Sequence, residues 1–377
     1  MCSERRPFIA TLVLAATALL AGCVTPPQMP RCSADELAYV GTDGTGLRAL
    51  RFDSCAGRLA SLGVVADVAK PRWTTPHPRL PVLYAALDSG RVAAFAVDRA
   101  SGALAVLNEA PAGGAGTTHL LLDAPSQTLL AANFGAGSVS TLAVQPDGRV
   151  GPTISTRQAS GSGPHRRQAS PHAHGSAVDP GGRYVLVPDL GADRVFVYGL
   201  NRATRTLAAD DVGRSLVVPP GSGPRRALFG RDGRFAYVLN ELSAELMVLA
   251  WDGAQGLLTP QQTLAVSTPG FQGVRSASEM LLSADGRFLY VGNRGEHLLT
   301  VYRVDAASGA LTLAQRLPSG GEGLWAFDLH ASGRWLLVAH YRSNRVQLFA
   351  VDPLTGQLTD TGRTVESPAP VSVGFMP

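Results

Sequence analysis

Four polar residues of types that bind and activate small acids are spread along this 377-residue chain: His174, Arg225, Glu241 and Arg294. Arginines offer fork-shaped donors to a carboxylate or phosphate. A histidine and a carboxylate can move protons near neutral pH. If the fold gathers them, the four suit an anionic sugar acid or a lactone. The alternative for each is a structural salt bridge between neighbouring parts of the fold.

We assign catalysis to His174 and Glu241, and substrate binding to the two arginines. Three further residues lie close to the same positions of a repeated sequence unit, and we expect them to help bind the substrate: His119, Glu279 and Arg72.

Other chemistries lack the residues that they need. Lys70 is the only lysine, which argues against a Schiff-base mechanism. The chain has no Cys-x-x-Cys or His-Glu-x-x-His signature. His165, His172 and His174 share one loop, where solvated histidines are commoner than metal ligands. No glycine-rich phosphate loop links a strand to a helix. We therefore expect no metal and no cofactor.

The candidate residues belong to a repeated unit that is clearest from Ser283 to Asp305. An Asp-Gly turn precedes a strand expected at Phe288–Asn293, and a polar loop leads to a second strand at Leu299–Asp305. Seven copies align, and the residues that follow the turn are Glu36, Pro81, Gln127, Arg183, Arg234, Arg287 and Arg334. Spacings of 45 to 56 residues, with several strands per unit, are typical of β-propeller blades.

Two positions of the repeat are expected to meet at one mouth of the central channel. Nine residues before the alignment point, the innermost strand of each blade begins with Arg72, Thr118, His174, Arg225, Ser278 or Trp325. Seven residues after it, the loop beyond the main strand holds Asp43, Asp88, Phe134, Leu190, Glu241, Arg294 or Tyr341. This loop lies opposite the Asp-Gly turn, at the end where the inner strands begin.

The two ends of the repeat array complement each other. The first copy has no inner strand ahead of Leu37, and the C-terminus has one to spare at residues 370–375, PVSVGF. An open seam would expose unpaired strand edges. We therefore predict an all-β fold, a seven-bladed β-propeller closed by a C-terminal strand that completes the first blade.

The N-terminus has the pattern of an export signal. An apolar run from Phe8 to Leu20 is too short to span a bilayer, and it ends in Leu-Ala-Gly-Cys at Cys23. This ending resembles a bacterial lipobox. We predict a lipoprotein signal peptide at 1–22, lipidation of Cys23, a tether at 23–35 and the propeller at 36–377. The expected location is the bacterial cell envelope, facing the periplasm or the exterior, with a lipid anchor as the only membrane contact. An ordinary signal peptide is the alternative, and Arg5-Arg6 also fits twin-arginine export.

Cys32 and Cys55 remain after signal removal and lipidation, and in an oxidising envelope they form a natural disulfide pair. Two separate thiols are the alternative. The net charge of +4 creates no strong field for nucleic acid. We expect a monomer.

The chain resembles the propeller lactonases, which include bacterial 6-phosphogluconolactonase of the propeller type and carboxy-cis,cis-muconate cyclase. The resemblance covers residues 36–375. The motifs that carry it are Pro-His-Ala-His at 171–174, Val-Asp-Pro at 178–180, Val-Pro-Asp-Leu-Gly at 187–191, Asp-Arg-Val at 193–195, Gly-Pro-Arg at 223–225, Asn-Glu-Leu at 240–242 and Asn-Arg-Gly at 293–295. It implies a seven-bladed propeller, lactone chemistry, and an active site at His174, Arg225, Glu241 and Arg294.

Three features depart from this family. Gly323-Leu324-Trp325 stands where the family tends to carry Pro-Arg, and His340-Tyr341 replaces an Asn-Gln type of loop. The segment from Ser155 to Pro171 is unusually basic. Our hypothesis is an exported lactonase-like hydrolase acting on a small lactone or organic acid. The rival is a non-catalytic envelope propeller that binds a ligand or a protein partner, because the fold serves both roles.

Overall fold

The computed structural model describes Met1, residues 32–208 and residues 213–377. The predictions of a signal peptide at 1–22, of lipidation at Cys23 and of most of the tether therefore lie outside the described residues. The described chain is almost entirely β-strand, with one short 3-10 helix, η1 (Ala124–Ser126). None of its helices is long or apolar enough to cross a membrane.

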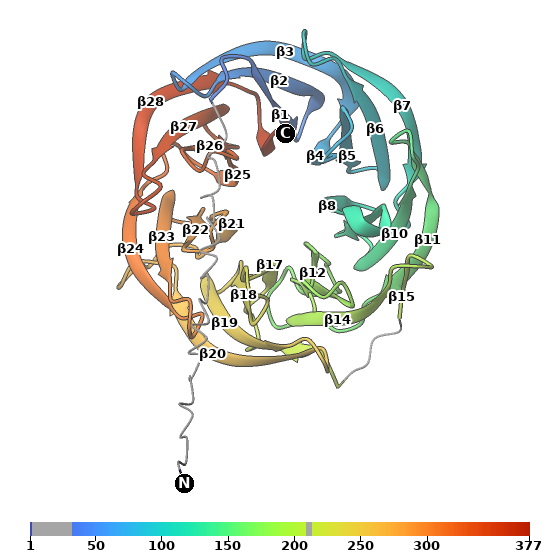
Figure 1. Ribbon diagram of the computed structural model, residues 1–377, viewed down its shortest axis with the longest axis vertical. Helices are drawn as coiled ribbons and strands as arrows, with labels where there is room; N and C mark the ends of the chain where they lie inside the picture. The colour runs from blue at the N-terminus through green and yellow to red at the C-terminus, as the bar shows by residue number, and fades with distance from the viewer. Residues whose placement is uncertain (2–31, 209–212) are drawn as a thin grey trace. The chain divides into compact units, whose positions relative to one another are not determined.

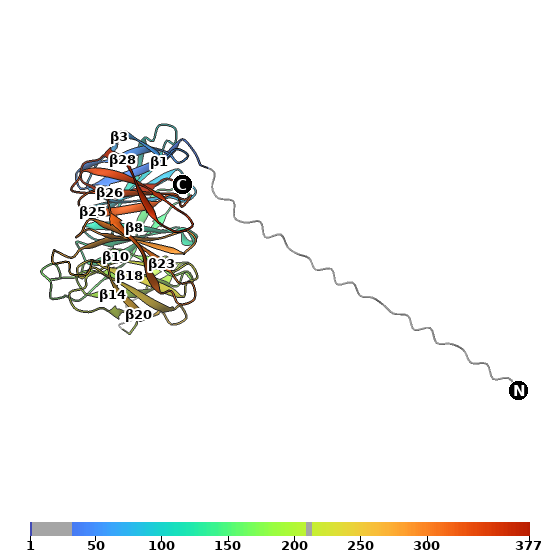
Figure 2. The same ribbon diagram turned by 90° about the vertical axis from the view of Figure 1, so that its left-hand side faces the viewer.

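Seven antiparallel sheets stand in a ring around a central channel (Figure 1), and Figure 2 shows the same ring from its edge. Blades two to seven each use consecutive strands of the chain. Blade one has the order β29-β1-β2-β3, so the last strand of the chain is its innermost strand. The predicted seven-bladed propeller, closed by a C-terminal strand, is confirmed.

Each strand has a rank within its blade, counted outward from the channel. From blade one to blade seven, the innermost strands are β29 (Pro370–Phe375), β4 (Pro71–Pro76), β8 (Thr117–Asp123), β12 (Ala177–Val178), β17 (Pro224–Phe229), β21 (Ala277–Leu282) and β25 (Leu324–Leu329). The second strands are β1 (Glu36–Thr42), β5 (Val82–Leu87), β9 (Thr128–Asn133), β13 (Tyr184–Asp189), β18 (Phe235–Asn240), β22 (Phe288–Asn293) and β26 (Trp335–His340). The third strands are β2 (Thr45–Asp53), β6 (Arg91–Val97), β10 (Ser138–Val144), β14 (Arg194–Asn201), β19 (Glu245–Asp252), β23 (Leu298–Val304) and β27 (Arg345–Val351).

The outermost strands are β3 (Arg58–Ala69), β7 (Leu104–Pro111), β11 (Val150–Gln158), β20 (Leu257–Ala265), β24 (Leu311–Pro318) and β28 (Leu358–Glu366), with two short strands, β15 (Thr206–Leu207) and β16 (Leu216–Val217), in blade four. Blade four also differs inside the ring. The inner strand expected from His174 onward is regular only at Ala177–Val178, and an isolated bridge joins Ala173 to Asp189 ahead of it.

The hydrophobic core lies between the blades. The second strands β5, β9 and β22 are buried along their whole length, because each is covered by a neighbouring blade on either side. Buried tyrosines on second strands reach across to the next blade. The hydroxyls of Tyr39, Tyr84 and Tyr237 donate to the carbonyls of Gly102, Gly148 and Gly309, at 2.9 to 3.0 Å. These bonds satisfy the polar end of a buried ring and fix the spacing of the blades.

A β-bulge at the start of the inner strand occurs in six of the seven blades, and in five of them it aims a side chain toward the channel mouth. In blade two, Pro71 pairs with Leu87 and Trp73 with Ala86, so that Arg72 is an extra residue. The equivalent extra residues in four other blades are Thr118, Arg225, Trp325 and Val371. Blade six has the same shift between Ala277 and Met280. Bulges redirect side chains in this way and are common beside functional sites.

Strand pairing closes the ring, and a disulfide braces the first blade beside the closure. β29 pairs with β1 from Ala38↔Phe375 to Thr42↔Pro370. Cys32 and Cys55 form the predicted disulfide, with an S–S distance of 2.09 Å. The bond ties the chain ahead of β1 to the turn between β2 and β3. Trp335 of blade seven adds a hydrogen bond from its indole Nε1 to the carbonyl of Ser54, at 2.9 Å.

Candidate functional site at the channel mouth

A cavity of about 710 Å³ opens at one mouth of the channel, and both predicted repeat positions line it. From the inner-strand position come Arg72, Thr118, His174, Arg225 and Trp325, joined by Val371 of the closing strand. From the loops after the second strands come Asp88, Phe134, Glu241, Arg294 and Tyr341. Ser278, Asp43 and Leu190, which hold the remaining places in the repeat pattern, are not part of the lining. The lining extends further to Trp73, Arg167, Arg226 and Arg342.

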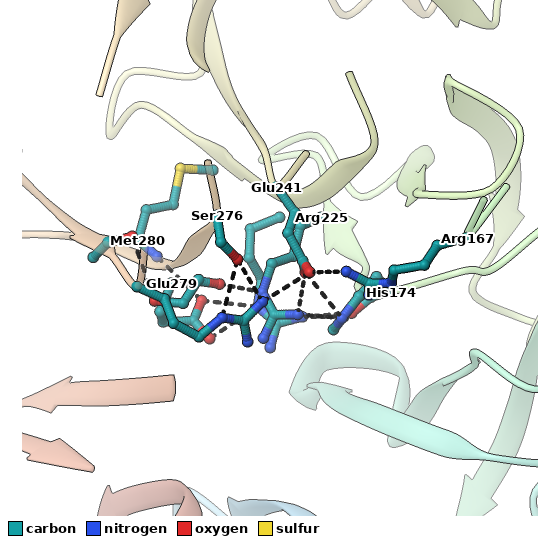
Figure 3. Close-up of polar contacts among 11 residues, drawn as sticks. Arg167, His174, Arg225, Glu241, Ser276, Glu279 and Met280 are labelled. Atoms are coloured by element: carbon teal, nitrogen blue, oxygen red, sulfur yellow. Dashed lines mark hydrogen bonds and ion pairs between the residues drawn. The ribbon is translucent and has the colours of Figure 1, made fainter. Parts of the chain in front are cut away.

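Glu241 is the centre of the site (Figure 3). Its buried carboxylate accepts from Arg225 Nη1 at 2.9 Å on one oxygen, and from Arg294 Nη2 at 2.8 Å and Arg167 Nη1 at 2.5 Å on the other. Burial would raise the pKa of Glu241, but Arg294, Arg225 and Arg167 outweigh it and hold the pKa well below the usual value. Glu241 is therefore ionised throughout the physiological range.

His174 lies beside this cluster and is buried. Its Nε2 accepts from Arg225 Nη1 and stands 3.9 Å from the nearer oxygen of Glu241. Burial, Arg225 and Arg226 together lower the pKa of His174 well below its usual value. The ring is consequently neutral. Guanidinium donors face both of its nitrogens, Arg225 at Nε2 and, in the longer contact of 3.4 Å, Arg226 at Nδ1, so we assign the proton to Nδ1. Burial also lowers the pKa of Arg225 to about 9.

Glu279 and His119 lie behind the lining rather than in it. Glu279 holds Arg226 through two bonds to Nε, at 2.8 and 3.0 Å. His119 packs against Trp73 with ring centroids 4.7 Å apart. Burial, followed by Arg226 and Arg225, lowers the pKa of His119 well below the usual value. Both residues therefore meet the cavity through another side chain, and their assignment to substrate binding stays a prediction.

Aromatic rings form another part of the wall. Trp325 packs against Tyr341 with centroids 5.3 Å apart, and the guanidinium of Arg294 lies 4.5 Å from the centre of the Trp325 ring. The ring of Phe134 meets His174 edge-on at 5.2 Å. The wall thus combines apolar ring faces with guanidinium donors next to them.

The cavity carries a surplus of positive charge. Six arginines line it, against two carboxylates, Asp88 and Glu241. Arg72 is neutralised by Asp43 at 2.7 Å and Asp88 at 3.0 Å. Three guanidiniums, in contrast, share Glu241. The site is therefore suited to an anion. Among the described residues, no three His, Cys, Asp or Glu side chains are placed to hold a metal ion.

The structure brings together five of the seven residues predicted for this mouth, namely Arg72, His174, Arg225, Glu241 and Arg294, and sets His119 and Glu279 one layer back. The alternative of salt bridges between blades is realised at the same time, because Arg294 of blade six pairs with Glu241 of blade five. Sequence reasoning missed Arg167. The available signal was the unusual basicity of its segment.

Fold and site together define a seven-bladed propeller whose inner-strand and loop residues build a cationic cavity at one mouth. Residues 34–375 match the family described as "Lactonase, 7-bladed beta-propeller", and this chain belongs to that family.

Among its relatives, a 6-phosphogluconolactonase of Bacillus subtilis is 30% identical over 347 residues, which cover 90% of this chain and 98% of the relative. The solved structure of a periplasmic gluconolactonase of Pseudomonas aeruginosa is 35% identical with a TM-score of 0.85, covering 91% of this chain and 99% of the other. A putative 6-phosphogluconolactonase of Bacteroides fragilis is 29% identical with a TM-score of 0.82, covering 94% of this chain and the whole of the other.

Proposed function

We propose that this chain is an exported lactonase that opens the lactone of an anionic sugar acid or a related organic acid. The observation that carries the proposal is the convergence of His174, Arg225 and Arg294 on the buried carboxylate of Glu241. The surplus of arginine in the cavity supports an anionic substrate. The names of the relatives support lactone hydrolysis and a sugar-acid lactone.

The proposed reaction needs one base and one stabiliser of negative charge. His174 Nε2 takes a proton from a water as the water oxygen bonds to the lactone carbonyl carbon. For this step the water replaces Arg225 as the partner of Nε2. Arg225 and Arg294 stabilise the oxyanion that develops on the carbonyl oxygen. The bond between this carbon and the ring oxygen then breaks, His174 returns the proton to the leaving oxygen, and a hydroxy acid is released.

Glu241 serves in this scheme as the anchor of the arginines. Both of its oxygens are occupied by guanidinium donors, and its low pKa makes it a weak proton acceptor. The aromatic face of Trp325 is placed to pack against the sugar ring.

The test is hydrolysis of a panel of lactones by the purified protein, followed by proton release. The panel contains gluconolactone, 6-phosphogluconolactone and a muconolactone. We expect turnover of at least one, and a loss of about 100-fold in kcat/KM for Glu241→Gln, comparable to removing one oxyanion donor. Glu245→Gln on β19 is the matched control, because its carboxylate forms none of the cavity contacts.

A Glu241→Gln protein as fast as the wild type would remove the assignment. Binding of intact lactones without turnover would favour the rival, a binding propeller of the envelope.

Export is the other half of the proposal. It is supported by the lipobox-like ending at Cys23, by the disulfide between Cys32 and Cys55, which suits an oxidising compartment, and by the periplasmic location in the name of one relative. In cells fed labelled palmitate, we expect the protein to carry label and to sediment with membranes. Cys23→Ala should abolish both, and label that persists in this variant would contradict the lipid anchor.

A further inference from the structure

A second hollow of about 480 Å³ adjoins the cavity and shares Arg167 with it. We call it the basic groove and define it by its two walls. One wall is residues 165–167 with Leu242, and the other is residues 271–276. No aspartate or glutamate lines it, whereas Arg166, Arg167, Arg275 and His165 do.

The first wall is a fixed turn. The amide of Gln168 donates to the carbonyl of His165 at 2.8 Å, which places Arg166 and Arg167 at the two central positions of a β-turn. The buried side chain of Gln168 pins the turn to the propeller, donating to the carbonyl of Leu190 at 2.8 Å and to Asp193 at 2.6 Å. The two arginines are therefore presented by a braced loop, with Arg167 reaching down to Glu241 and its neighbour facing the groove.

The second wall is tied to the catalytic cluster. The hydroxyl of Ser276 accepts from Nε and Nη2 of Arg294, at 3.1 and 2.9 Å. Further back, the backbone amide of Thr268 donates to the carboxylate of Glu296. Arg275 is exposed next to Ser276. The first wall thus contains Arg167, which binds Glu241, and the second contains Ser276, which binds Arg294 of the same cluster. Figure 3 shows Arg167 and Ser276 on opposite sides of Glu241.

We propose that the basic groove binds a second anionic group of the substrate, a carboxylate or phosphate carried beyond the lactone ring. This inference rests on the proposed function and narrows its substrate class. Arg166 and Arg275 line a groove that no carboxylate lines, whereas Arg167 at its boundary is held by Glu241. The two exposed guanidiniums favour such a group through fork-shaped hydrogen bonds and charge. Arg167 lines both the cavity and the basic groove. A single substrate therefore spans the two, with its lactone ring near His174 and its second anionic group between Arg166 and Arg275.

The test is calorimetric binding of three open-chain acids to the full protein at low and at physiological salt. Gluconate has one anionic end, glucarate has a carboxylate at both ends, and 6-phosphogluconate has a phosphate at the far end. We expect glucarate or 6-phosphogluconate to bind at least 10-fold more tightly than gluconate. The one that gains identifies the far group as carboxylate or phosphate.

The Arg166→Ala/Arg275→Ala variant should reduce this affinity ratio to less than 3-fold. Arg334→Ala should keep the ratio of the wild type, because Arg334 is an exposed arginine ahead of β26, at the end opposite Tyr341. The proposed role of the basic groove would be refuted if the wild type bound the three acids equally tightly. It would also be refuted if the double variant kept the affinity ratio of the wild type.

Binding requires no turnover, so the two proposals fail separately. A protein that prefers the doubly acidic ligands but hydrolyses no lactone of the panel refutes the lactonase and leaves the groove. A lactonase with no preference refutes the groove alone. Circular dichroism of the double variant checks that the propeller is intact.

Discussion

The Glu241 carboxylate accepts from three guanidiniums, and at the scale of single residues this contact divides the work at the site. Its pKa is held so low that it remains charged, which keeps Arg225 and Arg294 in place. His174 is neutral in the same surroundings, so it has a lone pair to offer a proton. The same guanidiniums therefore give the two potential bases different roles. They keep the Glu241 carboxylate charged and a weak proton acceptor, and they keep the His174 ring neutral and able to accept a proton.

The first prediction concerns the pH dependence of the base. Burial, Arg225 and Arg226 lower the pKa of His174, and base catalysis is lost as the pH falls through that value. kcat/KM, which reports the free enzyme, should therefore stay level from pH 8 to below 6.5. A bound anion offsets the two arginines and raises the pKa of His174, so the acidic limb of kcat should lie at higher pH than that of kcat/KM.

The His174→Asn variant should no longer show the fall of kcat at acidic pH, and its kcat should be roughly 100-fold or more lower than that of the wild type. His77→Asn is its control, because His77 follows β4 at the end away from the cavity and lines neither the cavity nor the basic groove. A limb of kcat/KM at or above pH 6.5, or one that survives His174→Asn, would assign the base to another group.

At the scale of elements, the bulge is what converts a strand into part of a site. An inner strand without it would alternate its side chains across the sheet. The extra residue at Arg72, Arg225 or Trp325 is released from that alternation and lines the cavity instead. Blade four has an equivalent irregularity. Ala173 pairs with Asp189 and Ala177 with Leu186, so its inner segment has one residue more than β13 over this stretch, and His174 lies within it.

The second prediction tests the bulge residue of β25. Trp325 provides a ring beneath Arg294 and beside Tyr341. Trp325→Ala should raise KM about 10-fold, since a desolvated cation–π contact is worth roughly 1 to 2 kcal/mol, and it should change kcat much less. Trp325→Phe keeps a ring and should recover most of the affinity. Steady-state kinetics on the best lactone of the panel measures this, and equal KM values for the two variants would argue against an aromatic role.

The elements also show which parts of the structure sequence reasoning could reach. Asp-Gly turns and apolar strands are local signals, so the seven repeats were predictable, and β22 and the closing strand β29 were predictable to the residue. The strand expected at Leu299–Asp305 is shifted by one residue, to Leu298–Val304. Arg167 was not, because it comes from a connection between β11 and β12 that has no counterpart in the repeat, and it meets Glu241 across 74 residues. His119 and Glu279 each come directly after the bulge residue of their strand. The shift in register at the bulge places them behind the lining, and the amino-acid sequence does not reveal that shift.

At the scale of the whole molecule, the ring depends on its seam. Blade seven and blade one are neighbours in the ring, and β29 from the C-terminal end of the chain is the innermost strand of the N-terminal blade one. Asp328 of β25 accepts the backbone amide of Phe375 at 2.9 Å, which ties blade seven to the closing strand. His330 likewise pairs with Glu36 across the seam. Because β29 also contributes Val371 to the cavity, an opened seam would alter the site.

The third prediction follows from the charge of Asp328. Burial raises its pKa to about 6, helped by Glu279 and opposed by the amides of Phe375 and Leu329. The folded state therefore holds this proton more tightly than the unfolded chain, where the pKa is near 4. The free energy of unfolding should fall as the pH rises from about 4 to 6, and the loss should be complete above that.

A shift of this size corresponds to at most about 3 kcal/mol, and solvent screening lowers this contribution because the Asp328 side chain is only partly buried. Denaturant unfolding of wild type and Asp328→Asn at pH 4.5 and 7.5 measures it. The variant should lose this part of the pH dependence and gain on the wild type at the higher pH. Asp360→Asn, a channel-remote carboxylate on β28, is the control. Parallel pH profiles for wild type and Asp328→Asn would show that the seam carries no buried proton.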